Sequence, residues 1–215
     1  MPQDCYLCGA ASGGQPVCAD CRAGLPFHRA ASCPVCALPT TEGEVCGHCQ
    51  RTPPAFDATR VAFDYVFPLD VLVQALKYRH KLALAGFFAD ALGVPQGFDL
   101  IVPMPLHPLR LSERGFNQAV EVARPLAAAA GLPLALAGLA RLRNTPSQAS
   151  LGRAERAANM RGAFKCTLRL DGMAVVVVDD VMTTGASLDE VARCLKACGA
   201  VRVENLVVAR TPAPL

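Results

Sequence analysis

Cysteine spacing is the feature that most restricts what this chain can fold into. Eight of its 11 cysteines form four Cys-x-x-Cys pairs within the first 49 residues. A shift of 28 residues places the first two pairs on the last two, so that Cys5 falls on Cys33 and Cys18 on Cys46. This part of the chain is therefore an internal repeat, and it predicts two small units of the same design.

Each unit supplies four thiolates, the number that completes a tetrahedral zinc site and leaves no open position for a substrate. We therefore expect structural zinc, two ions in all. Pairing within each repeat is the simplest arrangement, and pairing across the repeats (first with third, second with fourth) stays open. The predicted ligands are Cys5, Cys8, Cys18, Cys21, Cys33, Cys36, Cys46 and Cys49.

The beginning of the chain shows neither the basic nor the apolar segment of a secretory signal. The longest uncharged stretch, 125–140, is too short to span a membrane. We therefore expect a cytoplasmic protein, in which thiols stay reduced and clustered cysteines bind metal more often than they form disulfides.

The sequence around Pro53 and Pro54 breaks the chain and predicts a boundary between a zinc-binding module, 1–53, and a second domain, 54–215. In the second domain apolar runs alternate with helical patterns, which predicts an α/β fold with a parallel sheet flanked by helices. Four consecutive valines, 175–178, indicate a central strand covered on both faces. The expected strands are 58–66, 99–103, 174–178 and 202–209, and the expected helices are 69–79, 82–92, 117–130 and 188–197.

Charge is distributed unevenly along the chain, although the formal net charge is only +3. Residues 1–53 carry three basic and four acidic side chains, a net of −1. Residues 141–169 carry seven basic side chains against one acid, a net of +6. Such a local excess suits phosphate groups on a small molecule or a nucleic acid, and a solvated basic face is the alternative.

Polar residues follow the valine strand directly. Asp179 and Asp180 come first, and a hydroxyl-rich turn with Gly185 then opens a helix. In open α/β sheets ligands bind at the carboxyl ends of strands, and the first N–H groups of a helix favour an anion. Adjacent carboxylates instead suit partners that donate hydrogen bonds, such as sugar hydroxyls or the water of a hydrated Mg²⁺. The pattern indicates a site for ribose 5-phosphate, and a simple helix-capping turn is the alternative.

With these residues, 175–187 resembles the phosphoribosyl pyrophosphate loop of type I phosphoribosyltransferases. The whole chain resembles the ComF family of competence-associated proteins, which combine such a domain with a cysteine module. Further stretches support the resemblance: Ala75 to Tyr78, Val102 to Pro105, Arg114 to Gln118, Arg143 to Thr145, and Gln148, Arg156 and Asn159.

The resemblance implies a role for each matching residue. Phosphoribosyl binding falls to Asp179, Asp180, Met182, Thr183, Thr184, Gly185, Ala186 and Ser187. Pyrophosphate binding falls to Met104, Pro105, Leu106, Arg110, Arg114 and Lys77. The catalytic candidates are Asp179, Asp180 and Arg143. Segment 141–161 would close over the ligand, and it carries Arg141, Arg143, Arg153, Arg156 and Arg161. We expect a cis or strained peptide within 103–106, and Asp179 and Asp180 facing solvent in the empty protein.

The implied activity is transfer of a phosphoribosyl group from phosphoribosyl pyrophosphate, with Mg²⁺, to an acceptor that the sequence does not identify. An alternative is a non-catalytic protein that handles single-stranded DNA, by itself or with other competence proteins. Residues 77–81 and 141–169 would then form a basic track. A purely structural zinc scaffold is a third interpretation, which leaves the polar turn without a role.

Overall fold

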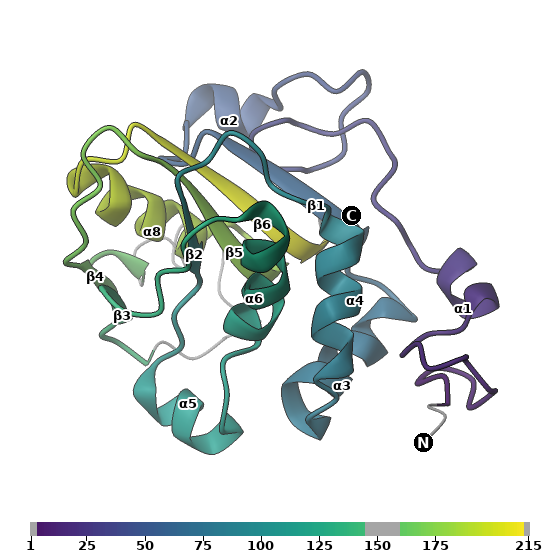
Figure 1. Cartoon of the computed structure of the whole chain (residues 1–215). Helices are drawn as coiled ribbons and strands as arrows, with labels where there is room; N and C mark the ends of the chain where they lie inside the picture. The colour runs from purple at the N-terminus through teal and green to yellow at the C-terminus, as the bar shows by residue number, and fades with distance from the viewer. Residues whose placement is uncertain (1–3, 145–159, 213–215) are drawn as a thin grey trace.

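A computed structural model describes residues 4–144 and 160–212 (Figure 1). Its centre is a sheet of four parallel strands in the order β1-β6-β5-β2, which confirms the expected α/β fold. The strands are β1 (Ala58–Asp64), β2 (Leu100–Pro103), β5 (Ala174–Met182) and β6 (Arg202–Arg210).

Helices cover both faces of this sheet (Figure 1). One face carries α3 (Leu69–Arg79), α4 (Ala83–Leu92) and α6 (Gln118–Ala130), and the other carries α8 (Ala186–Ala197). The N-terminus of α6 is capped by Asn117, whose side chain accepts from the N–H of Ala119 at 2.9 Å. These four helices and the four strands of the sheet lie close to their predicted positions.

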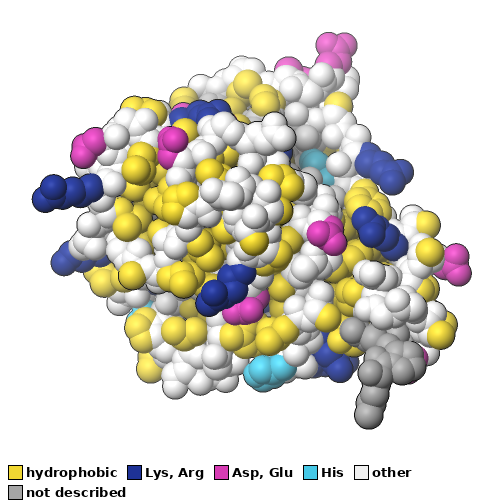
Figure 2. Space-filling model, viewed as in Figure 1, with side chains coloured by type: hydrophobic (Ala, Val, Ile, Leu, Met, Phe, Trp, Pro, Cys, Tyr) yellow, Lys and Arg dark blue, Asp and Glu magenta, His cyan; other side chains and the backbone are white. Residues whose placement is uncertain are grey.

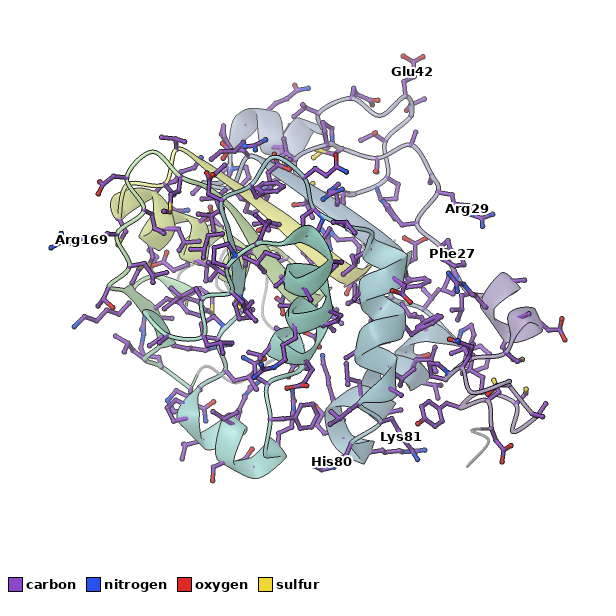
Figure 3. All side chains as sticks on the ribbon, viewed as in Figure 1. Phe27, Arg29, Glu42, His80, Lys81 and Arg169 are labelled. Carbon is purple, nitrogen blue, oxygen red and sulfur yellow. The ribbon has the colours of Figure 1, made fainter. Side chains whose placement is uncertain are left out.

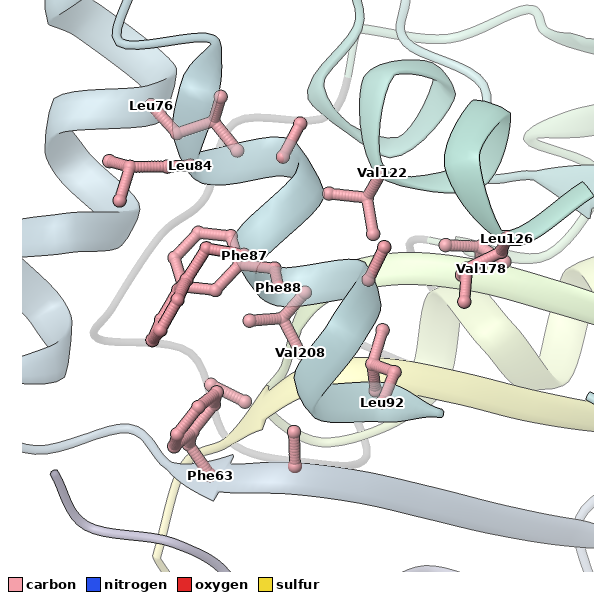
Figure 4. Close-up of a cluster of buried hydrophobic side chains, with 14 of the residues drawn as sticks. Phe63, Leu76, Leu84, Phe87, Phe88, Leu92, Val122, Leu126, Val178 and Val208 are labelled. Atoms are coloured by element: carbon pink, nitrogen blue, oxygen red, sulfur yellow. The ribbon is translucent and has the colours of Figure 1, made fainter. Parts of the chain in front are cut away.

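Two apolar cores result, one on each face. Figure 4 shows part of the first, in which Phe63 of β1 packs with Phe87 and Phe88 of α4, and which also includes Val122 of α6. The second core lies between the sheet and α8. The valines of β5 alternate between the two cores, since Val176 and Val178 face the first, and Val175 and Val177 face the second. This alternation is why an uninterrupted apolar run forms the central strand.

In the described part of the α/β domain, three short elements were not predicted. Helix α5 (Pro108–Arg114) follows β2, and β3 (Leu139–Arg141) pairs antiparallel with β4 (Phe164–Cys166) beside the second core. Each is only three to seven residues long. Elements of this length present too few residues for an apolar period to be recognised.

The two cysteine units lie against different cores. Each contains one short helix, α1 (Ala19–Ala23) or α2 (Gly47–Arg51), and each helix starts just after a cysteine. The first unit contributes Cys5, Val17 and Leu25 to the first core. The second contributes Cys33, Cys36 and Cys49 to the second core. We name them the first ribbon, residues 4–25, and the second ribbon, residues 31–51.

Residues 53 and 54, the proposed domain boundary, lie between α2 and β1. Within the described part of the chain, no helix combines the length and the apolar character that crossing a membrane requires.

Candidate functional site

The turn 183–185 joins β5 to α8 at the carboxyl end of the central strand. Gly185 adopts a left-handed conformation, with φ 82°, as the residue that caps α8. A Cβ atom there would lie 2.7 Å from Cε of Met182 and 3.8 Å from the Phe56 ring. The backbone conformation therefore favours glycine, whereas the flexible end of Met182 could shift to make space. A β-branched residue, as in Gly185→Val, would strain the turn through this positive φ.

Hydroxyl groups surround this turn. Thr183 is exposed, and Thr184 and Ser187 are half-buried. The Thr184 hydroxyl oxygen accepts a hydrogen bond from the N–H of Ala186, the first residue of α8, at 3.4 Å. The 12-residue helix directs the positive end of its dipole at the same place. The turn thus carries hydrogen-bond donors of the kind that bind an anion.

The two acids differ from expectation, because they are buried within β5 and do not face solvent. Their exposed fractions are 9% for Asp179 and 6% for Asp180. The strand continues to Met182, four residues past its predicted end at 178, because Asp179 and Val181 still pair with β6. The low strand propensity of aspartate predicts that the strand ends at this pair. In the structure the pairing with β6 outweighs that propensity, and the strand continues.

Lys77 of α3 explains how an acid can be buried there, since its ammonium group forms an ion pair with the Asp180 carboxylate. Burial alone would raise the pKa of Asp180, but the charge and hydrogen bonds of Lys77 hold that pKa below its ordinary value. Burial also opposes the charged form of Lys77, yet the Asp180 carboxylate raises the lysine pKa. Lys77, which was expected to contact the pyrophosphate, therefore forms an ion pair with Asp180 in this structure.

Asp179 has the opposite electrostatic character. Burial, and then the negative charge of Asp180, raise the pKa of Asp179 well above its ordinary value. One oxygen of Asp179 accepts from the N–H of Asp180 at 2.9 Å. The two adjacent carboxyl groups thus differ in protonation behaviour, a property that is common at functional sites.

A polar network continues from Asp180 to the surface. The side chain of Gln118, at the start of α6, forms a hydrogen bond with Asp180. Arg114, at the end of α5, donates to the Gln118 side-chain oxygen and lies 5.1 Å from the ring centre of Tyr78. Arg114 was expected at a pyrophosphate. The role of Gln118 was missed, although it occurs in the stretch that carries the family resemblance.

Arg141 brings positive charge to the other acid. Burial and the charge of Arg110 lower the pKa of Arg141, and the carboxylate of Asp179 opposes this effect. Arg141 of β3 therefore interacts with Arg110 of α5 and with Asp179 of β5. Arg143, the expected catalytic arginine, is exposed and donates to the Arg161 carbonyl. Among the described residues of that segment, Arg141 is the one whose charge acts on Asp179.

The segment after β2 starts beside β5, because Pro103 pairs with Val178. The expectation of a cis or strained peptide within 103–106 was wrong. In the described residues the cis peptide joins Phe67 to Pro68. The N–H of Met104 donates to the Val178 carbonyl at 2.8 Å and extends the ladder past β2. Met104 is buried, whereas Pro105 and Leu106 are half-buried and lead towards α5.

Several expected residues fall outside the described part of the chain: Thr145, Gln148, Arg153, Arg156 and Asn159. The segment expected to close over the ligand is therefore described only at its two ends, 141–144 and 160–161.

The cysteines form two groups of four, one in each ribbon, and within each group the sulfur atoms lie within 4.8 Å of one another. Cys8 and Cys18 are 3.8 Å apart between sulfurs, and Cys36 and Cys46 are 3.6 Å apart. Four converging thiols fit a tetrahedral Zn²⁺ and leave no ligand position open. The structure thus confirms pairing within each repeat and supports a structural role for the metal.

Comparisons with known families agree with both halves of the fold. Residues 1–50 match the double zinc ribbon domain, and residues 114–215 match the phosphoribosyl transferase domain. Among solved structures, the allosteric regulatory enzyme of purine biosynthesis aligns with 57% of this chain and 24% of its own, at 21% identity. The TM-score of that alignment is 0.37, which is too low to add to the assignment.

Relatives align along nearly the whole chain. The DNA utilization protein YhgH of Salmonella typhi is 32% identical over 225 residues, which cover 98% of each chain. Competence protein F of Haemophilus influenzae is 29% identical over 77% of this chain and 78% of its own. Competence protein ComFC of Bacillus subtilis is 28% identical over 84% of this chain and 78% of its own.

Proposed function

Because this chain belongs to the ComF and YhgH family, we propose that it binds phosphoribosyl pyrophosphate at residues 183–187, which are the turn and the start of α8. Proteins of this family are phosphoribosyltransferase-like and carry a double zinc ribbon. We further propose that this chain transfers the phosphoribosyl group to an acceptor. One observation carries this proposal: a left-handed glycine turn opens α8 directly beside two buried acids of unlike pKa.

The ligand's 5′-phosphate suits the turn. Backbone N–H groups at the start of α8 and the hydroxyls of Thr183, Thr184 and Ser187 are hydrogen-bond donors to an anion. Thr183 is exposed, so a ligand can reach the turn from solvent.

The ribose hydroxyls suit Asp179 and Asp180, which lie in the strand that leads into the turn. A carboxylate accepts through about four lone-pair sites, so Asp180 can keep Lys77 and still accept from a hydroxyl. A protonated Asp179 would itself donate to a ribose oxygen. The pair therefore offers both an acceptor and a donor to a sugar edge.

The pyrophosphate suits Arg141 and its neighbour Arg110. Arg141 interacts with both Arg110 and Asp179, and one guanidinium group can bind two phosphate oxygens at once. In the proposed reaction the bond from C1′ to the pyrophosphate oxygen breaks, and its electron pair leaves with the pyrophosphate. The acceptor's lone pair forms the new bond to C1′. The arginines would stabilise the charge that develops on the leaving group.

Mg²⁺ would arrive with the ligand's phosphates. In the described residues, the groups of three or more potential metal ligands are the two cysteine groups, and neither includes the acid pair. Mg²⁺ in such sites is held by one or two carboxylates together with substrate phosphates, and it neutralises phosphate charge. The chain thus fits a ligand-borne Mg²⁺ better than a resident one.

Calorimetric titration of the purified protein with phosphoribosyl pyrophosphate, with and without Mg²⁺, tests the proposal. Asp180→Asn should weaken binding about tenfold to a hundredfold, because a hydrogen bond to a charged group contributes roughly 1.5–3 kcal/mol. Asp90→Asn, an exposed site on α4, is the matched control and should bind like the parent protein. Equal affinity in all three proteins would exclude the acid pair from the site.

A second candidate function is binding of single-stranded DNA, and a surface next to the site favours it. Tyr78 is 68% exposed, and the rings of His80 and Phe116 lie 5.4 Å apart. His80 and Lys81 project from the end of α3 on the side of the molecule that carries α5 (Figure 3). Exposed aromatic rings among basic groups can stack bases and contact phosphates. Relatives named for DNA utilization and competence suit this candidate.

Charge on the visible face argues against a broad track, because Lys and Arg side chains there stand apart among apolar and uncharged groups (Figure 2). Fluorescence anisotropy with an oligothymidine at two salt concentrations separates the candidates. Salt-sensitive binding that Tyr78→Ala weakens, without binding of phosphoribosyl pyrophosphate, would replace the first proposal with the second.

A further inference from the structure

Arg210, the last residue of β6, joins the second ribbon to the turn. It is only 3% exposed. Its Nε atom donates to the Cys36 carbonyl at 3.0 Å. Its Nη1 atom donates to the Met182 carbonyl at 3.0 Å and also to the Thr183 carbonyl. One buried guanidinium therefore connects the backbone of a metal-ligand residue with the backbone of the proposed phosphate site.

A second set of contacts joins the same two regions. Ala55 and Phe56 follow the second ribbon in the chain. The N–H of Ala55 donates to Asp189, in the first turn of α8, at 2.6 Å. The Phe56 ring, which is 4% exposed, lies against the position of Gly185. The segment that directly follows the second ribbon thus also contacts α8 and the turn.

These contacts bear on anion binding through peptide geometry. A peptide group is planar, so fixing a carbonyl also fixes the direction of the N–H that follows it. Holding the Met182 and Thr183 carbonyls therefore sets the direction of the N–H groups of Thr183 and Thr184. These two groups belong to the turn that would face a phosphate.

The first ribbon makes contacts elsewhere. Its Arg22 lies 5.6 Å from the ring centre of Phe87 on α4. His28 follows the first ribbon in the chain, and its Nδ1 atom lies 2.7 Å from Oδ1 of Asp64. Asp64 ends β1, the strand at the edge of the sheet. These contacts lead to the first core and to Asp64, which pairs in register with Arg210, and none of them is made to the turn itself.

We propose that Arg210 is a positioning residue, through which metal in the second ribbon, but not in the first, holds the turn 183–185 in its anion-binding geometry. As regulation of the phosphate site, this inference rests on the proposed function. The mechanical link itself can be measured without any ligand.

Two equivalent cysteines provide the test. Cys18 and Cys46 occupy the same position in the repeat and are both half-buried. Cys18→Ser and Cys46→Ser should each lose one of the two zinc ions, measured by mass spectrometry of the metal. Amide hydrogen exchange would then be followed in a peptide that covers 182–187. We expect Cys46→Ser to speed exchange there at least tenfold and Cys18→Ser to change it less than twofold, because groups that support a site typically alter its function 10- to 100-fold.

Arg210→Lys tests the link without disturbing any metal ligand. Lysine keeps the positive charge, but its single ammonium cannot span the four carbonyl groups, of Cys36, Met182, Thr183 and Thr211, that the guanidinium fork reaches. The variant should keep both zinc ions and still show faster exchange at the turn. If Cys46→Ser unfolds, this variant decides the question alone. Unchanged exchange in Arg210→Lys, or equal acceleration in both cysteine variants, would overturn the proposal.

Titration of the same proteins with ribose 5-phosphate separates this inference from the proposed function. If the parent protein does not bind ribose 5-phosphate but exchange still follows the second ribbon, the link stands and the proposed function fails. If the ligand binds equally to all variants and exchange is unaltered, the proposed function stands and the link is wrong.

Discussion

The two ribbons repeat each other in sequence but differ in their surroundings. In the first, Cys8 is exposed, and no residue of α1 is buried. In the second, Cys33, Cys36 and Cys49 are all buried in the core that also holds Met182 and α8. The repeated cysteine spacing therefore gives both ribbons the same kind of metal site. The core against which each ribbon packs determines which part of the fold its metal stabilises.

The largest expected effect comes from removing equivalent ligands. Cys5 and Cys33 are both buried, but Cys33 lies in the core beneath the turn. Cys33→Ser should destabilise the protein by more than about 3 kcal/mol, or roughly 6–12 °C in melting temperature, because loss of a metal site in a core leaves buried groups unpaired. Cys5→Ser should cost clearly less. Thermal melts with zinc analysis would measure this, and a larger loss in Cys5→Ser would reverse the comparison.

The next effect separates the ligand site from the metal sites. Asp180→Asn should lower affinity for phosphoribosyl pyrophosphate about tenfold to a hundredfold. Both zinc ions should remain, since Asp180 pairs with Lys77 and touches neither ribbon's ligands. Calorimetry and zinc analysis of one preparation check both statements. Loss of zinc together with affinity would mean that the acid pair supports the second ribbon as well.

Asp179→Asn should change how stability depends on pH. The pKa of Asp179 is raised in the folded protein by burial and by Asp180, so the folded state binds this proton more tightly than the unfolded state does. Stability is then lost as pH rises above the unfolded value, about 3.9, towards the folded value. Asparagine, which does not ionise, removes that loss. Melts at pH 5 and pH 8 should show a larger advantage of the variant at pH 8, and a constant difference would contradict the assignment.

The smallest effect concerns the outer contact of the first ribbon. Arg22 lies over the Phe87 ring, and an exposed cation–π contact contributes about 0.5–1 kcal/mol. Arg22→Ala should lower stability by about that amount and leave ligand affinity unchanged. Urea unfolding and calorimetry measure the two. A change in affinity would show that the first ribbon also reaches the site.

The sequence predicted the larger features because each had a strong local signal. Ligand spacing identified both ribbons, and the four valines identified β5. The strand's end was misjudged because Asp179 and Asp180 are unfavourable in isolation, whereas here pairing with β6 and the charge of Lys77 keep them inside. Sequence spacing alone carries no sign of an ion pair between α3 and β5.

Arg210 shows the same limit. It is one of 21 Lys and Arg residues, and no motif distinguishes it. Its importance comes from burial where β6, the second ribbon and the turn meet, and only the fold brings those three segments together. Similarly, it is Arg141, and not the expected Arg143, that interacts with Asp179, and Arg141 belongs to the strand β3, which was too short to predict.

The most direct test of the proposed function is a nuclear magnetic resonance titration of the zinc-loaded protein with ribose 5-phosphate, with the amides of Thr184 and Gly185 assigned. If the turn binds the phosphate, these amide signals should shift in a saturable way, and phosphoribosyl pyrophosphate should displace the ribose 5-phosphate. Signals of the first ribbon should stay unchanged. Saturable shifts elsewhere with none at the turn, or no shifts at all, would contradict the account.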